Sequence, residues 1–275
     1  MKYGPQVVYK KIGETPLMAL EDLRFEHPEL KDLPMTYAGR LDPVAEGVLL
    51  VLVGEDCKEK DKYLSLTKEY ELSVLFGFDT DTYDLLGEVK SVYSTSSEIV
   101  FERSSDLLIN TENTLGQTVS NTISDSVVSA LKKFIGDINQ SYPPYSSRTV
   151  DGKPLFQIAR DGNIDEVKIP EHIVHIENIE MLESKNISKE DLGKHINSLI
   201  NTVKGDFRQD DIKKRWVEAL ASSTLSEYPI FKLRVLCGSG SYMRVLAHDL
   251  GHELGIPALA YHIKRTKVGE YEIKK

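Results

Sequence analysis

The 275-residue sequence contains little cysteine and lacks any long apolar run. Two cysteines, Cys57 and Cys237, cannot form a disulfide framework or a four-thiolate metal site, and we expect both thiols to be reduced. No stretch approaches the roughly 18 consecutive apolar residues that a membrane span needs. The first residues, MKYGPQVVYKK, lack the apolar core of a secretory leader. We therefore expect a cytoplasmic protein that does not enter the membrane.

An excess of positive charge is also missing, because the formal net charge is −9. This value argues against a general nucleic-acid binder, whose affinity comes largely from neutralised phosphates. The charge is uneven, however. Residues 76–126 hold nine acidic and two basic residues, whereas residues 231–275 hold eight basic and four acidic residues. Local fields steer a ligand, so a basic RNA-binding side with modest, salt-sensitive affinity is compatible with this composition.

The most informative segment is Tyr37-Ala38-Gly39-Arg40-Leu41-Asp42-Pro43, which precedes residues 47–54. Those eight residues hold six branched aliphatics between two glycines, a pattern that predicts a buried strand. Asp42 would then lie on a turn just before a rigid strand, where a carboxylate is fixed yet reachable, as a nucleophile must be. Alternatively, Asp-Pro is an ordinary turn dipeptide.

Further patterns predict the neighbouring elements. Residues 15–24 indicate a short helix with Pro16 in its first turn, and residues 70–76 alternate as a strand does. Apolar residues repeat with helical spacing from position 242 to 254, with Arg244 and His248 on the opposite stripe. A surface arginine is the alternative for Arg244. A further helix should follow Ser188. The basic cluster at 213–215 could contact RNA, but we expect a solvated helix face.

Four ordered motifs resemble the TruB-type pseudouridine synthases. They are TYAGRLDPVAEGVLLVLVGEDCK, Lys68-Glu69-Tyr70 with FGFDTDTYDLLGEV, QSYPPYSSRTVDGKPLFQIARDG, and VLCGSGSYMRVLAHDLGHELG with IKRTKVGEY. An ordered set is far more specific than a single short motif. The resemblance implies an α+β fold, a mixed and largely antiparallel sheet flanked by helices. It also implies one catalytic domain over residues 1–275, with insertions at about 91–125 and 183–228 and without a C-terminal PUA module.

The resemblance implies isomerisation of uridine to pseudouridine, above all at position 55 in the T-loop of tRNA. It makes Asp42 the nucleophile, Arg244 its ion-pair partner and Tyr70 the ring that stacks on the flipped uracil. The RNA-binding residues would be Tyr37, Arg40, Lys68, Arg148 and Tyr242. We expect no cofactor, no metal, no guide RNA and no protein partner, and a monomer that binds the T-arm.

Several departures from the family pattern concern the choice of RNA. Tyr37 stands where the bacterial enzymes commonly have His, and Arg40 gives a Gly-Arg-Leu-Asp string like that of ribosomal-RNA pseudouridine synthases. Thr149 replaces a basic residue, with Arg148 displaced by one position. Ribosomal or other RNA therefore stays open as the substrate.

Three other interpretations are open. A non-catalytic RNA-binding or RNA-folding relative would keep the cleft without needing Asp42 and Arg244. His248-Asp249-Leu250-Gly251-His252 resembles a zinc helix with Asp in place of Glu, but no third ligand is evident. Gly238-Ser239-Gly240 resembles part of a nucleotide turn, without its third glycine. The acidic loop at 79–84 lacks the Gly and distal Glu of an EF-hand, so we expect it to form a hydrogen-bonded turn near the pocket.

Overall fold

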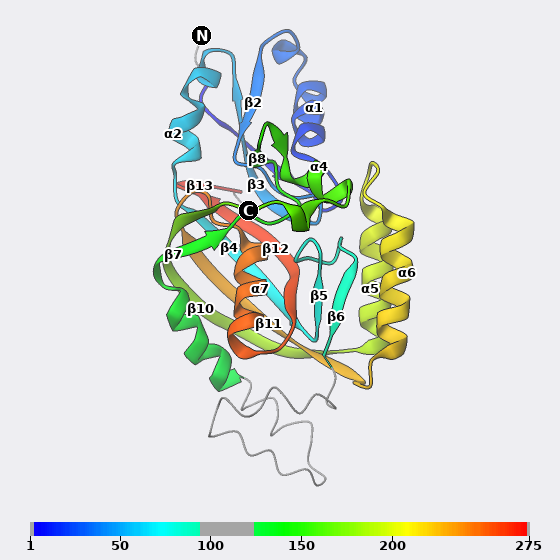
Figure 1. Cartoon of the computed structure of the whole chain (residues 1–275). Coiled ribbons are helices and arrows are strands. Elements are labelled where there is room, and N and C mark those ends of the chain that lie inside the picture. Colours follow the sequence, from blue (N-terminus) through cyan, green and yellow to red (C-terminus); the bar gives the residue numbers. More distant parts are fainter. Residues whose placement is uncertain (1–2, 94–123, 274–275) are drawn as a thin grey trace.

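The computed structural model describes residues 3–93 and 124–273 and is built around one large sheet (Figure 1). The path of this nine-stranded sheet is β1-β3-β12-β4-β11-β10-β7, with β2 paired to β3 and β13 to β12. Its strands are β1 (Gln6–Lys10), β2 (Met35–Ala38), β3 (Ala45–Val53), β4 (Lys68–Phe76), β7 (Gly136–Ser141), β10 (Glu171–Ser188), β11 (Glu227–Cys237), β12 (Ala258–Val268) and β13 (Tyr271–Glu272). Strands β3 and β12 run parallel, and the other pairs of this sheet in the described residues are antiparallel. The α+β prediction is confirmed.

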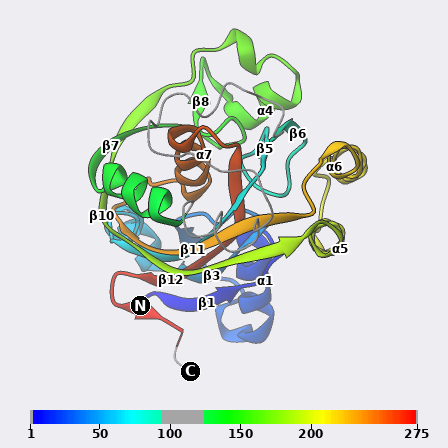
Figure 2. The same cartoon turned by 90° about the horizontal axis from the view of Figure 1, so that it is seen from below.

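Helices cover both faces of the sheet, with α7 on one face and α1 on the other (Figure 2). The α-helices are α1 (Pro16–Glu26), α2 (Lys60–Leu64), residues 124–131, α4 (Leu155–Arg160), α5 (Lys189–Thr202), α6 (Gln209–Ser222) and α7 (Met243–Leu254). The 3-10 helices are η1 (Pro28–Leu30), η2 (Glu55–Glu59), η3 (Lys132–Phe134) and η4 (Ile164–Glu166). Two small hairpins pair β5 (Phe78–Thr80) with β6 (Val89–Val92) and β8 (Thr149–Val150) with β9 (Lys153–Pro154). Within the described ranges, no helix is long and apolar enough to cross a membrane.

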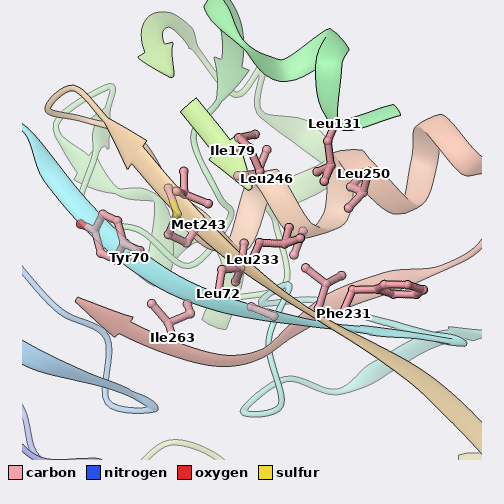
Figure 3. Close-up of a cluster of buried hydrophobic side chains, with 14 of the residues drawn as sticks. Tyr70, Leu72, Leu131, Ile179, Phe231, Leu233, Met243, Leu246, Leu250 and Ile263 are labelled. Atoms are coloured by element: carbon pink, nitrogen blue, oxygen red, sulfur yellow. The ribbon is translucent and has the colours of Figure 1, made fainter. Parts of the chain in front are cut away.

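The main core lies between α7 and the centre of the sheet (Figure 3). Leu246 and Leu250 of α7 pack in one cluster with Leu72 of β4 and Leu233 of β11. Strand β4 is buried throughout from Leu72 to Phe76, so its burial does not alternate as its sequence does. The cause is a second apolar cluster on the opposite face, which contains Leu75. Both faces of β4 are therefore covered, which fixes the strand that carries Tyr70.

Two predicted helix starts are confirmed. The Thr15 hydroxyl accepts the backbone N–H of Met18 at the start of α1, with Pro16 in the first turn. Ser188 caps α5 by accepting the N–H of Asp191. Both caps satisfy backbone donors that the first helical turn leaves free.

The two predicted insertions have different outcomes. Most of the stretch at 91–125 lies outside the described residues. The stretch at 183–228 contains a helical hairpin, α5 and α6, between the paired strands β10 and β11. Strand β10 continues in register with β11 up to Ser188, so the helices themselves begin at Lys189, and the bounds of the insertion stay a prediction.

Candidate active site

Asp42 and Arg244, 202 positions apart, meet in an ion pair. Asp42 lies in the connection from β2 to β3, and Arg244 lies in the first turn of α7. The Arg244 Nε donates to Asp42 Oδ2 at 2.7 Å. The Arg244 side chain is 4% exposed and that of Asp42 is 33% exposed. The Arg244 guanidinium is thus buried, whereas part of the Asp42 carboxylate remains exposed. The alternative of a surface arginine is wrong.

Three further groups fix the Arg244 guanidinium. It donates to the Thr82 carbonyl at 2.6 Å and to the Tyr145 carbonyl at 3.2 Å, and the Asp84 carboxylate lies 3.7 Å from Nε. Burial lowers the pKa of Arg244, but the charges of Asp42 and Asp84 outweigh it, and the pKa lies above its ordinary value. The result is a permanent cation that is held in one orientation beside Asp42.

Asp84 belongs to this site although the sequence did not single it out. Its carboxylate is 4% exposed, and burial raises its pKa to about 6 despite the opposing effect of Arg244. One oxygen accepts hydrogen bonds from the Thr82 hydroxyl at 2.6 Å and from the Leu86 N–H at 2.9 Å. The predicted hydrogen-bonded turn at 79–84 is therefore confirmed, and it also supplies two contacts to the catalytic arginine candidate.

The ion pair opens onto a cavity of about 960 Å³. This volume lies in the range of pockets that hold drug-sized ligands. Six site residues were predicted besides Asp42 and Arg244, and five of them line the cavity: Tyr37, Arg40, Lys68, Tyr70 and Tyr242. The sixth, Arg148, lies outside the lining.

Tyr70 lies at the wall of the same cavity. It lies on β4, is 8% exposed and lines the cavity together with Asp42. Burial raises the pKa of its hydroxyl, so the ring stays neutral at ordinary pH. A fixed aromatic ring beside the carboxylate can hold a flipped base against the nucleophile.

Lys68, which was expected to bind RNA, has acceptors for its ammonium within the protein. Its ammonium is buried and donates to the backbone carbonyls of Leu64 and Leu66, each at 2.5 Å. Burial lowers its pKa to about 8, with Arg265 as a further cause. The long side chain ends on carbonyls of the connection between α2 and β4, and a contact of Lys68 with RNA stays a prediction.

Arg265 of β12 is a second functional candidate that the sequence motifs did not single out. It is 1% exposed and donates to the Val48 carbonyl at 2.7 Å and to the Gly39 and Arg40 carbonyls at 3.1 and 3.3 Å. These bonds attach the loop before Asp42 to the sheet. The backbones of β3 and β12 also approach each other so closely that position 47 must be glycine, since a Cβ there would lie 2.1 Å from the Arg265 carbonyl oxygen.

Arg148 forms part of an aromatic group near the cavity. Its guanidinium lies 5.0 Å from the centre of the Tyr142 ring, which stacks on His172 at 4.1 Å. Tyr242 meets the Tyr142 ring edge-on at 5.8 Å, and its backbone is held by the buried Gln140 amide. The cation and the rings lie where RNA leaving the cavity could contact them.

The zinc interpretation finds no support in the geometry. His248 pairs with Asp79 through Nδ1 at 3.2 Å and stacks on Tyr83 at 4.0 Å. In the described part of the chain, no three His, Cys, Asp or Glu side chains are grouped so that they could hold a metal ion. Residues 238–240, which resemble part of a nucleotide turn, instead line the cavity beside Tyr242.

Comparison with known proteins assigns the chain to a family. The model of the TruB family pseudouridylate synthase (N terminal domain) matches residues 30–120 and 98–205, well over half of the sequence. The chain belongs to the TruB family. The resemblance in the four motifs is thereby confirmed.

Curated TruB relatives cover nearly the whole chain. The tRNA pseudouridine synthase B of Staphylococcus aureus is 30% identical over 277 residues, which cover 100% of this chain and 69% of that protein. The protein of the same name from Parabacteroides distasonis is 27% identical over 242 residues, covering 88% of this chain and 74% of its own length.

A solved structure supports the TruB fold. The crystal structure of a Cbf5-Nop10-Gar1 complex contains a chain with a TM-score of 0.51 and 18% identity. The match covers 98% of this chain and 50% of that one, so this TruB-family chain spans about half the length of its structural relative. At this identity the likeness concerns the fold.

Proposed function

We propose that this TruB-family protein converts uridine to pseudouridine in RNA, with the T-loop uridine at position 55 of tRNA as its substrate. The observation that carries the proposal is the 2.7 Å contact between Arg244 and Asp42 at the wall of a cavity that Tyr70 also lines. Relatives named tRNA pseudouridine synthase B support the choice of tRNA. A binding protein without catalysis would need a cavity, but not a fixed ion pair aimed into it.

The reaction rearranges one nucleotide and consumes no reagent. The bond between ribose C1′ and uracil N1 breaks, the uracil turns, and a bond forms between C1′ and C5. The proton on C5 leaves to solvent, and N1 takes up a proton, so atoms and electrons balance without a cofactor. Since a stacked base is out of reach, the uridine must first be extruded into a pocket.

Asp42 would act as the nucleophile that allows the uracil to detach and turn. A carboxylate can attack ribose C1′, so that the C1′–N1 bond breaks and uracil leaves as its anion, or it can add to uracil C6 across the C5–C6 double bond before the C1′–N1 bond breaks. In both cases the bond to Asp42 breaks again as the product forms, which regenerates the carboxylate. Arg244 would keep Asp42 ionised and aimed at the nucleotide. The carbonyls of Thr82 and Tyr145 would hold the guanidinium in place while the Asp42 carboxylate loses its charge in the covalent adduct.

The remaining cavity residues would hold the nucleotide and its neighbours. Tyr70 would stack on the flipped uracil, as aromatic rings do in single-strand binding. Tyr37, Arg40 and Tyr242 line the same cavity and would contact the flanking RNA, with Arg148 just beyond them. We propose that residues 1–275 act as one catalytic domain in the cytoplasm, as a monomer, without guide RNA or protein partner.

Tritium release from C5-labelled uridine tests the function. The substrate is a T-arm minihelix. The control is a matched minihelix in which cytidine replaces the target uridine and the remaining uridines carry the C5 label. Release from the first substrate alone is the expected result. Release from ribosomal or bulk RNA but not from the T-arm would keep the chemistry and change the substrate. Binding without release from any RNA would replace the proposal with a non-catalytic RNA-binding function.

A further inference from the structure

The α5–α6 hairpin reaches the cavity with its tip, the residues that join the two helices. The tip packs on the β1–α1 connection, where the Lys204 N–H donates to the Gly13 carbonyl at 3.1 Å. A Cβ at Gly13 would lie 2.3 Å from the Thr202 carbonyl oxygen, so glycine permits this approach. Three residues of the tip line the cavity: Asp206, Phe207 and Arg208. Figure 1 shows α5 and α6 side by side beyond the end of the sheet.

Arg208 attaches this tip to the acidic loop that contains Thr82 and Asp84. Its guanidinium donates to Asp81 at 2.8 Å and to Glu88 at 2.9 Å, and all three side chains are at least three-quarters buried. The Trp216 indole of α6 adds a bond to the Leu85 carbonyl at 3.2 Å. The connection between β5 and β6 is therefore held near both of its ends by the hairpin.

The same guanidinium also contacts the segment on the other side of the cavity. It lies over the Tyr145 ring, 4.5 Å from its centre. The Tyr145 backbone carbonyl is one of the acceptors of Arg244. In addition, Arg160 of this segment donates to Asp206 of the tip at 3.1 Å. One side chain thus contacts both segments whose backbone carbonyls bind Arg244.

The backbone at Arg208 is held in an unfavourable conformation. Its φ of 62° and ψ of 32° lie in the left-handed region, which L residues other than glycine adopt at a cost. Such conformations persist where surrounding contacts over-determine them, often near functional sites. Here the contacts that hold it are the two carboxylates and the tyrosine ring.

We propose that Arg208 is a positioning residue for the isomerisation: it holds together the two segments that orient Arg244. The inference rests on the proposed function. Arginine suits this task because its planar fork bonds two carboxylates while its face stacks on a ring, which lysine cannot do. Arg208 acts through Thr82 and Tyr145, and does not touch the nucleotide.

Steady-state kinetics on the T-arm minihelix test the proposal with three variants. Arg208→Ala and Arg208→Lys remove the fork, and Arg215→Ala is the matched control, because it removes a half-exposed arginine of α6 that also faces Glu88. We expect kcat to fall about tenfold in both Arg208 variants, with KM within about threefold, and no change in the control. A rise in KM at constant kcat would show direct RNA contact and overturn the proposal, as would unchanged kinetics in the Lys variant.

Hydrogen exchange gives a readout that does not depend on activity. Arg208→Lys should speed exchange in residues 80–88 and 142–162, while exchange in β3 and β4 stays as in the wild type. Exchange at the wild-type rate in both segments would overturn the proposal. Faster exchange throughout the protein would also overturn it, because it would mean general destabilisation. If the wild type releases no tritium, the proposed function fails, and exchange alone decides whether Arg208 holds the two segments.

Discussion

At the residue scale, the cations around Asp42 are held largely by backbone carbonyls. Lys68 and Arg265 donate to carbonyls of the connections that enclose the cavity, and the buried ammonium of Lys10 donates to the Ala45 carbonyl at 2.5 Å. Carbonyls fix a cation without cancelling its charge as a carboxylate would. The cavity therefore keeps positive charge close to the nucleophile in a protein that is acidic as a whole.

Lys68→Met tests whether this lysine contacts RNA. Because the ammonium donates to two backbone carbonyls and the side chain is largely buried, we expect RNA affinity to stay within about threefold of wild type. The free energy of unfolding should fall by about 1–3 kcal/mol, since both carbonyls lose their donor. Filter binding and urea denaturation measure the two quantities. A tenfold loss of RNA affinity at unchanged stability would show that Lys68 contacts RNA.

The pKa of Asp84, raised from 3.8 to about 6, predicts a pH dependence of stability. The folded state binds the proton more tightly than the unfolded state, so this group's stabilisation is complete below pH 3.8 and is lost as pH rises through 6. Asp84→Asn stays neutral and lacks this loss. The free energy of unfolding of the variant relative to wild type, measured by urea denaturation, should therefore rise by about 2 kcal/mol between pH 4.5 and 7.5. A difference that is the same at both pH values would contradict the buried carboxylate.

Sequence alone located the residues that lie in short motifs. Asp42, Tyr70 and Arg244 were found because each belongs to a string that recurs in the family. Asp84 was within such a string, yet its burial could not be foreseen from an acidic, turn-like loop. Arg208 gave no signal, because its partners lie more than 60 positions away and depend on how the hairpin folds back.

At the element scale, β3 positions Asp42 through its pairing with three other strands, one of them parallel. It pairs antiparallel with β1 and β2 and parallel with β12, where Gly47 lies opposite Arg265. The positive φ of Gly47 and the nearby carbonyl leave no room for a side chain. The glycine at the start of this strand is therefore a requirement of the sheet that carries Asp42.

Gly47→Ala should destabilise the protein strongly, and Gly136→Ala is the matched control. Both glycines have positive φ, of 115° and 99°, but only Gly47 faces backbone atoms at contact distance. We expect the first variant to lose at least about 2 kcal/mol more free energy of unfolding than the second, because overpacking adds to backbone strain. Equal losses in urea denaturation would show that β12 moves away at little cost.

Elements with strong local signals were predictable, and long-range pairing was not. The apolar run of β3 and the Thr15 and Ser188 caps identified their elements directly. The parallel pairing of β3 with β12 joins segments about 200 positions apart, and no local pattern records it. The extension of β10 to Ser188 was missed because its last residues are polar and mostly exposed.

At the scale of the whole molecule, a net charge of −9 limits how many phosphates can be neutralised. We expect tRNA binding to weaken with salt along a line whose slope, in log affinity against log salt, is about −2 to −4. Such a slope corresponds to about three to five phosphate contacts. Titrations from low to moderate salt measure it. A slope near zero, or one steeper than about −7, would contradict an RNA-binding surface confined to the cavity rim.

The central claim is that Asp42 is the nucleophile held by Arg244. Single-turnover tritium release with Asp42→Asn tests it most directly, because the amide keeps the size of the side chain and an oxygen for Arg244. Release should vanish, while RNA affinity stays within about threefold and the thermal midpoint shows a folded protein. A variant that binds RNA normally and retains more than about a tenth of the wild-type rate would contradict the claim, since loss of a nucleophile costs far more than tenfold.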